Sequence, residues 1–186
     1  LSEIINNNFL DNQKFNKSKI LDEIGKTKNS IFEQYNDLIK FHNFNSKIIT
    51  DKAPQNFLWI GFIKIFFPGS KIIHCSRNPK DNCLSIFKNY FSSKTMYWAY
   101  DQKSIAEYYV LYSNLMEFWK SKFNEDIYEA NYEKIVNSPE SEVKKMISFC
   151  GLEWESECLN FYKNKKTPVQ TVSVSQASKP IYNTSI

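Results

Sequence analysis

The sequence predicts an α/β protein in which a short parallel sheet lies between layers of helices, built as one domain over residues 1–186. Two observations predict this fold. From Ser46 onward, short β-branched runs alternate with apolar helical segments, the order typical of parallel βαβ units. A chain of 186 residues with 42% hydrophobic and 16% aromatic content is also large enough to bury one core.

The N-terminal part, residues 1–45, is predicted to form polar surface helices with one buried face. Its larger apolar side chains, such as Leu10, Ile24, Ile31 and Tyr35, recur at helical spacing around the linker DNQKFNKSK.

The βαβ unit follows this region. The expected order is a strand SKIIT (46–50), a helix QNFLWIGFIKIFF (55–67) ending at Pro68-Gly69, a strand KIIHC (71–75) and a helix PKDNCLSIFKNYF (79–91). The crossover between the two strands should be right-handed.

Further elements complete the domain. We expect a long aromatic helix from about Ser104 to Phe123, a strand DIYEA (126–130), a helix from Pro139 to Cys150 capped by Gly151, and a short helix over 155–163. The tail from residue 165 to 186 has the composition of an extended loop.

Charge and hydropathy exclude several classes of partner. The net charge is +4 and the lysines are scattered, so the sequence predicts neither nucleic acid nor an anionic bilayer as a partner. No stretch approaches the roughly 18 apolar residues of a membrane span.

The four cysteines, Cys75, Cys83, Cys150 and Cys158, form no CxxC pair. We therefore expect buried free thiols, no metal site and a reducing compartment such as the cytoplasm.

Two strand exits carry the same arrangement. Lys52-Ala53-Pro54 follows the first expected strand and Arg77-Asn78-Pro79 follows the second, so each exit has a cation, one spacer and a proline suited to a first helical turn. Because ligands of open α/β sheets bind beyond the carboxyl ends of the strands, the two cations are predicted to meet one anionic ligand.

Ser85 adds a hydroxyl to this prediction. It lies seven residues after the expected helix N-cap Asn78, about two turns along the same ridge. Taken singly, Arg77 or Lys52 fits a solvated cation and Ser85 fits a helical serine bonded to its own backbone. Their combination at equivalent strand ends favours an anion site.

Several motifs in a fixed order resemble a known family. They are ITDKAPQNFLWIGFIKIFFPGSKIIHCSRNPKDNCLSIF, YEANYEKIVNSPE, FCGLEWESECLNFY and TVSVSQASKPIYNTSI. From about Lys47 to the last residue the chain resembles sulfotransferases that use 3'-phosphoadenosine 5'-phosphosulfate (PAPS), especially bacterial enzymes linked to tetratricopeptide repeats and related to tyrosylprotein sulfotransferases. The resemblance implies a three-layer P-loop-like fold, sulfuryl transfer to a hydroxyl acceptor and upstream tetratricopeptide repeats in the full-length protein.

The resemblance also implies roles for individual residues. Arg77 and Ser85 match the pair that holds the 3'-phosphate of PAPS or of its product, adenosine 3',5'-bisphosphate (PAP), and Tyr132 matches a tyrosine beside the adenine. Lys52 matches the lysine that approaches the bridging oxygen. Ser173 matches a serine near the reacting sulfonate, and Gln176 and Lys179 match the mobile loop that closes over the cofactor. No metal is implied.

One departure from the family pattern concerns the phosphosulfate loop. The chain has only four glycines and no P-R-S-G-T type turn. In the family the general base normally lies near that turn, and we do not assign this role to Glu3. We therefore expect a partial domain, truncated at both ends. Micromolar affinity needs about 8 kcal/mol, whereas one charged hydrogen bond contributes roughly 1.5–3 kcal/mol, so these residues alone should bind weakly and not turn over.

Two other functions stay open at this point. One is a non-catalytic nucleotide-binding or assembly module that keeps a degenerate sulfotransferase fold. The other is a nucleoside or nucleotide kinase, which would require a G-K-[ST] phosphate loop and a magnesium-binding aspartate. His74, within the second strand, is expected to be a core or interface histidine.

Overall fold

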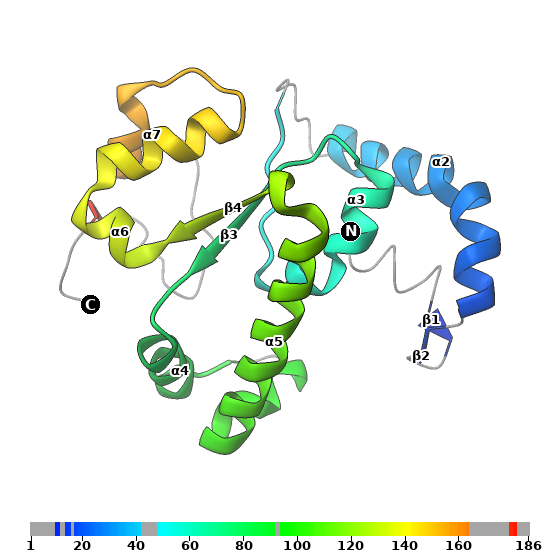
Figure 1. Cartoon of the computed structure of the whole chain (residues 1–186), viewed down its shortest axis with the longest axis horizontal. Coiled ribbons are helices and arrows are strands. Elements are labelled where there is room, and N and C mark those ends of the chain that lie inside the picture. Colours follow the sequence, from blue (N-terminus) through cyan, green and yellow to red (C-terminus); the bar gives the residue numbers. More distant parts are fainter. Residues whose placement is uncertain are drawn as a thin grey trace. The chain divides into compact units, whose positions relative to one another are not determined.

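The computed structural model describes residues 10–11, 14–15, 17–41, 48–91, 94–163 and 179–181, and they fall into two compact units (Figure 1). The first unit spans residues 1–70 and the second spans residues 71–186. The expectation of one domain over the whole chain stays a prediction.

The first unit is mainly helical. Its elements are β1 (Leu10–Asp11), β2 (Lys14–Phe15), α2 (Lys17–Phe41), the 3₁₀ helix η1 (Pro54–Trp59) and α3 (Ile60–Phe66). Ile31 of α2 and Phe66 of α3 form its buried core, and Tyr35, Trp59 and Phe67 pack against them. The hydrophobic face predicted for the N-terminal region therefore supplies this core.

Two segments of the first unit differ from the prediction. Leu10–Asp11 and Lys14–Phe15 pair as an antiparallel hairpin where DNQKFNKSK was predicted to be a linker between helices, and the sequence there contains Asp and Asn, which favour turns. Residues 48–50 form no strand, although SKIIT was predicted as one. A strand is defined by hydrogen bonds to a neighbour, and no strand of the described residues pairs with this segment.

The helix predicted over 55–67 is divided into η1 and α3. Its end is held by the buried ammonium of Lys64, which donates to the carbonyl oxygens of Pro68 at 2.6 Å and Ser70 at 2.9 Å. These bonds satisfy carbonyl groups in the turn that follows the helix, so this lysine is structural.

The second unit contains a parallel pair of strands with helices around it. Its elements are β3 (Ile72–Ser76), α4 (Pro79–Lys88), η2 (Lys94–Tyr100), α5 (Gln102–Phe123), η3 (Asn124–Asp126), β4 (Ile127–Asn131), α6 (Tyr132–Asn137), α7 (Pro139–Phe149), η4 (Ser156–Leu159) and η5 (Phe161–Lys163). Strands β3 and β4 pair in the register Ile72↔Ile127 to Ser76↔Asn131.

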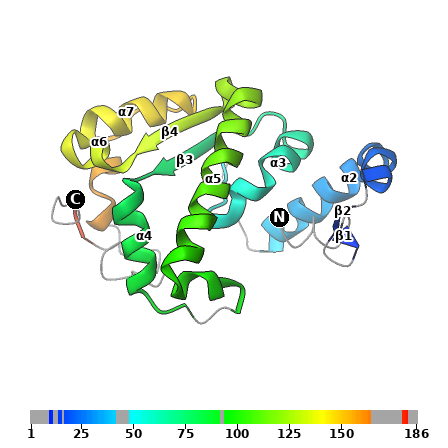
Figure 2. The same ribbon diagram turned by 60° about the horizontal axis from the view of Figure 1, so that its bottom comes forward.

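The two faces of this sheet are covered by different helices. His74 and Glu129 point to the face where α5 lies, and Tyr128 points to the other face, with its ring 5.4 Å from that of Phe149 in α7. Figures 1 and 2 show the strands between these helices. The predicted α/β fold, with a short parallel sheet between helical layers, is confirmed.

Local signals in the second unit are also confirmed. Gly151 ends α7 with a positive φ of 70°, the left-handed conformation that favours glycine at a helix C-terminus. The four cysteines are free thiols as predicted, but the expectation that they are buried is wrong: Cys75 is exposed and the other three are half-buried. Cys75 and Ile73 of β3 are both exposed on the strand face opposite to His74.

Candidate functional site

The exit of β3 is a tightly hydrogen-bonded turn. Arg77 follows the strand, and the side-chain oxygen of Asn78 accepts a hydrogen bond from the backbone N–H of Lys80 at 2.9 Å. Pro79 occupies the first turn of α4, so the predicted N-cap and proline are both confirmed. The turn fixes the backbone on both sides of Arg77.

The exit of β4 is also capped by an asparagine. Asn131 ends the strand and caps α6 by accepting a hydrogen bond from the N–H of Lys134 at 2.9 Å. Tyr132 is the first residue of α6, directly after that cap. Because β3 and β4 are parallel, their carboxyl ends lie side by side, and both exits are at the same end of the sheet (Figure 1).

The two exits bring Arg77 and Tyr132 together. The guanidinium carbon of Arg77 lies 5.1 Å from the centroid of the Tyr132 ring, a cation–π contact. The backbone N–H of Asn78 donates to the carboxylate of Glu133 at 2.8 Å, a second link between the exits. Two residues predicted for one nucleotide therefore lie side by side, although they are far apart in the sequence.

Charge at this edge is balanced between Arg77 and Glu133. The hydrogen bond from the Asn78 N–H lowers the pKa of Glu133, and the positive charge of Arg77 adds to that effect. Arg77 is the only arginine among the 24 lysine and arginine residues of the chain. The one guanidinium of the chain therefore lies at this strand exit, where it can stack on an aromatic ring and donate two parallel hydrogen bonds to an anion. All other basic side chains of this group are lysines.

Ser85 lies in α4, half-buried, two turns after Asn78. Its backbone carbonyl accepts a hydrogen bond from the side chain of Asn89 at 2.6 Å. A joint action of Ser85 and Arg77 on a phosphate stays a prediction.

Lys52 is an exposed side chain of the first unit, directly before η1. Its neighbour Asp51 accepts hydrogen bonds from the Tyr35 hydroxyl at 3.1 Å and from the Asn56 amide at 3.4 Å. Burial, followed by the charge of Asp51, raises the pKa of Tyr35 to about 12, so this hydroxyl is a donor at neutral pH. These two bonds hold the side chain of Asp51, which directly precedes Lys52.

The remaining predicted site residues are in the C-terminal tail. Ser173 and Gln176 lie outside the described residues. Lys179 is exposed, in the short described segment 179–181. The roles predicted for these three residues stay predictions.

A polar cluster beneath the strand exits was not predicted as a functional feature. His74 of β3 and Glu129 of β4 form a hydrogen bond of 2.8 Å, and the side chains of Tyr112 and Lys120 join them from α5. Partial burial by itself would raise the pKa of Glu129, but hydrogen bonds from Lys120, Ser76 and His74 lower the pKa to about 2. One feature of the sequence could have indicated this cluster: His74 lies three residues before Arg77, and Glu129 lies three residues before Tyr132.

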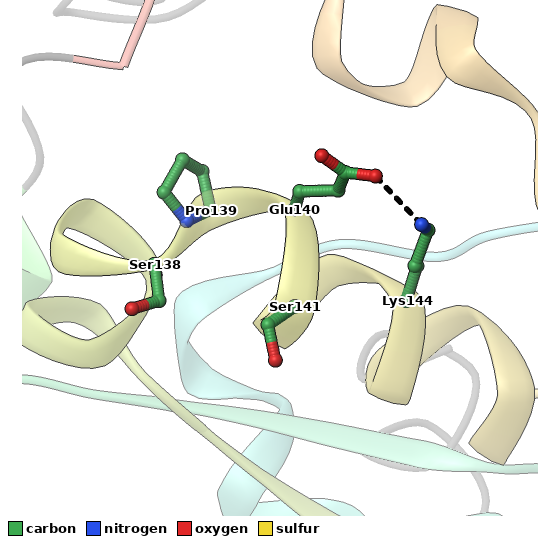
Figure 3. Close-up of a pocket in the computed structure, with 5 residues that line it drawn as sticks. All are labelled: Ser138, Pro139, Glu140, Ser141 and Lys144. Carbon is green, nitrogen blue, oxygen red and sulfur yellow. Dashed lines mark hydrogen bonds and ion pairs between the residues drawn. The ribbon is translucent and has the colours of Figure 1, made fainter.

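An open depression elsewhere in the second unit lies at the start of α7 (Figure 3). It is lined by Ser138, Pro139, Glu140, Ser141 and Lys144. Glu140 and Lys144 form an ion pair of 2.6 Å along the helix, as expected for residues four apart. None of the predicted site residues lines it.

Within the part of the chain that the structure describes, no helix combines the length and apolarity needed to cross a bilayer. The same described residues contain no group of three or more His, Cys, Asp or Glu side chains arranged to hold a metal ion.

Comparison with known proteins identifies the family. The model of the sulfotransferase family matches residues 5–156. The chain belongs to the sulfotransferase family. The match includes both strand exits of this sulfotransferase and also takes in the N-terminal helical region, which the resemblance starting near Lys47 did not include.

A relative of this sulfotransferase is an uncharacterized protein of Aquifex aeolicus (strain VF5), 37% identical over 140 residues. The matched region covers 74% of this chain and 18% of the relative. The match therefore spans less than a fifth of the length of that protein.

Proposed function

We propose that this sulfotransferase transfers a sulfuryl group from PAPS to a hydroxyl acceptor. The observation that carries the proposal is the stacking of Arg77 on Tyr132 at paired strand exits, in a chain that belongs to the sulfotransferase family. The family assignment supports a transferase, and the geometry supports a nucleotide-linked anion as one of its ligands.

The strand exits suit a 3'-phosphoadenosine group. The guanidinium of Arg77 can donate two parallel hydrogen bonds to a terminal phosphate, and the Ser85 hydroxyl can donate a third from α4. Tyr132 offers an aromatic surface next to that phosphate, which suits the adenine ring. In this proposal Glu133 stays hydrogen-bonded to Asn78 and holds the exit loop in shape.

Lys52 and Ser173 are proposed to act at the reacting sulfonate. Sulfuryl transfer resembles phosphoryl transfer in needing in-line positioning and neutralisation of charge on the leaving phosphate. An ammonium at the bridging oxygen provides that neutralisation, and the anchored Asp51 next to Lys52 supports a defined backbone there. Gln176 and Lys179 are proposed to cover the bound cofactor.

The 186 residues acting alone are proposed to bind the cofactor only weakly. They contain no glycine-rich turn to hold the 5'-phosphosulfate, so the cofactor would be bound mainly through its 3'-phosphate and adenine. A few charged hydrogen bonds of roughly 1.5–3 kcal/mol each do not reach micromolar affinity after the ordering costs of binding. We expect weak binding of PAP and no turnover.

Calorimetry with PAP tests the ligand. The 186-residue chain should show weak binding that Arg77→Ala abolishes. Lys103→Ala is the matched control, because Lys103 is an 84% exposed cation on α5 whose loss should leave the affinity unchanged. Equal affinity of the Arg77→Ala variant and the parent chain would contradict the phosphate role of Arg77.

A transfer assay with radiolabelled PAPS tests the chemistry. The 186 residues should give no labelled product with hydroxyl acceptors, whereas a longer gene product that adds a glycine-rich phosphate loop should give one. Labelled product from the 186 residues alone would overturn the expectation of inactivity. Binding of PAP without transfer by a product that has the loop would favour the non-catalytic module.

A further inference from the structure

The cluster beneath the strand exits connects three elements of the second unit. His74 and Glu129 lie directly opposite each other in the parallel register, and the imidazole Nδ1 is 2.8 Å from the Glu129 carboxylate. From α5, the Tyr112 hydroxyl reaches the other imidazole nitrogen, Nε2, and the Lys120 ammonium reaches the same carboxylate. The Ser76 hydroxyl adds a further hydrogen bond to Glu129.

The hydrogen bonds of the cluster place one proton of the imidazole. Nδ1–H donates to the Glu129 carboxylate, which can only accept, and Nε2 is bonded to the Tyr112 hydroxyl, which can donate to a bare nitrogen or accept from an N–H. A proton on Nδ1 satisfies the contact with Glu129 in either case. The His74 side chain is 11% exposed, so water competes little for these bonds.

The register of β3 and β4 needs such an anchor. Each strand has five residues, and a two-stranded parallel pair of that length has little stability of its own. A slip of one residue would turn His74 and Glu129 to opposite faces of the sheet. It would also remove the alignment of Ser76 with Asn131, from which Arg77 and Tyr132 emerge together.

We propose that His74 and Glu129 are positioning residues for the nucleotide site. Their hydrogen bond, anchored to α5 by Tyr112 and Lys120, fixes the β3–β4 register and thereby holds the Arg77 guanidinium over the Tyr132 ring. The cluster lies three residues, or about 10 Å of strand, from these exits, so it acts through the backbone and not on the ligand. Only the identity of the ligand rests on the proposed function.

NMR of the ligand-free chain tests the positioning role directly. Arg77 is the only arginine, so its Nε–H gives a single signal, shifted by the ring current of Tyr132. Tyr132→Leu supplies the reference position without the ring. We expect His74→Leu to move the Arg77 signal to that reference, and His74→Asn, whose amide can replace Nδ1–H, to keep it near the position in the parent chain.

A control separates positioning from general stability. Tyr128→Leu removes packing against Phe149 on the other face of the same sheet, and it should lower stability while leaving the Arg77 signal in place. If the Arg77 signal of folded His74→Leu stays at the parent position, the positioning role is overturned. If His74→Leu fails to fold, Glu129→Ala provides the same comparison, with Glu129→Gln as its conservative partner.

The imidazole state provides a second spectroscopic test. In the parent chain, ¹⁵N spectra should show a proton on Nδ1 of His74, assigned by comparison with His42→Gln, since the chain has two histidines. Tyr112→Phe should shift the Nε2 signal and leave Nδ1 bonded to Glu129. A proton on Nε2 alone would contradict the arrangement.

Titration with PAP links the cluster to binding. His74→Leu should weaken binding about tenfold, which equals about 1.4 kcal/mol, whereas His74→Asn should stay within about twofold of the parent chain. If the Arg77 signal responds as expected but the parent chain does not bind PAP, the proposed function fails and the positioning role stands. If PAP binds equally to the parent chain and to His74→Leu, the link to the ligand is overturned.

Discussion

Arg77 combines three properties that a lysine would not supply together. It stacks on Tyr132, it lies beside the Glu133 carboxylate, and its planar fork can donate two parallel hydrogen bonds to a phosphate. The sequence alone indicated its place at a strand exit. The partner ring became visible only when β4 was placed beside β3.

Replacing Arg77 with lysine separates charge from shape. Arg77→Lys keeps the positive charge but loses the fork, so the affinity for PAP should fall about tenfold, less than in Arg77→Ala. Calorimetry of the parent chain, Arg77→Lys and Arg77→Ala at one salt concentration gives the order of their affinities for PAP. Equal affinities of Arg77→Lys and the parent chain would show that only the charge matters.

Tyr35 is expected to stabilise the loop that carries Lys52. Tyr35→Phe removes the hydrogen bond to Asp51 and should cost about 1 kcal/mol of stability. Amide exchange of Asn56, whose N–H bonds to Ala53 at 3.0 Å, should become faster. Tyr162→Phe, on η5, serves as a control, and unchanged exchange in Tyr35→Phe would show that Asp51 does not need this donor.

At the level of elements, the contact of α5 with the sheet is partly electrostatic. Glu129 of β4 is bonded both to His74 of β3 and to Lys120 of α5, so one carboxylate joins three elements. Such a network stabilises one specific arrangement, because each partner would be left unsatisfied in another. Strand pairing and helix docking in this unit therefore depend on each other.

The low pKa of Glu129 makes this arrangement sensitive to acid. The folded-state pKa of about 2 lies below the ordinary value of 4.5, so the unfolded chain binds a proton first as the pH falls. The stabilisation is complete above pH 4.5 and is lost as the pH falls toward 2. The side chain is 40% exposed, so we expect about 1 kcal/mol instead of the roughly 3 kcal/mol that the shift alone implies.

Urea unfolding at pH 3 and pH 7 measures this effect. Glu129→Gln should reduce the difference in unfolding free energy between the two pH values, because the amide does not titrate. Glu153→Gln, which removes an exposed carboxylate outside the cluster, should leave the difference unchanged. A pH dependence that is identical in Glu129→Gln and the parent chain would contradict the assignment.

On the scale of the whole molecule, the chain comprises two compact units and corresponds to a small part of its relative from Aquifex aeolicus. The predicted anion site draws Lys52 from the first unit and Arg77 from the second, and their approach to one ligand stays a prediction. The single domain predicted from length and composition has a direct consequence for unfolding.

A single domain should unfold in one cooperative step. We expect α3 of the first unit and α5 of the second to lose protection against hydrogen exchange at the same urea concentration. Exchange measured by mass spectrometry on peptides from the two helices gives both midpoints. Separate midpoints would show that the units are independent domains, in contradiction to the prediction.

The sequence by itself predicted β3, α4, α5, β4 and α7 in their order, the caps at Asn78 and Gly151, and the placement of Arg77 at a strand exit, but it did not predict the short helix α6. These features depend on periodicity, proline and capping side chains within a few residues, so short patterns predict them. The predicted strand at 46–50 was wrong over its described residues because a strand also needs a neighbour.

Only the tertiary structure decided which residues meet across the sheet. His74 and Glu129 are 55 positions apart, and the same register places Arg77 against Tyr132. A shift of one residue would preserve every local pattern and still separate both pairs. The contacts proposed to fix the register join β3, β4 and α5, which are far apart in the sequence, so no short stretch of sequence contains them.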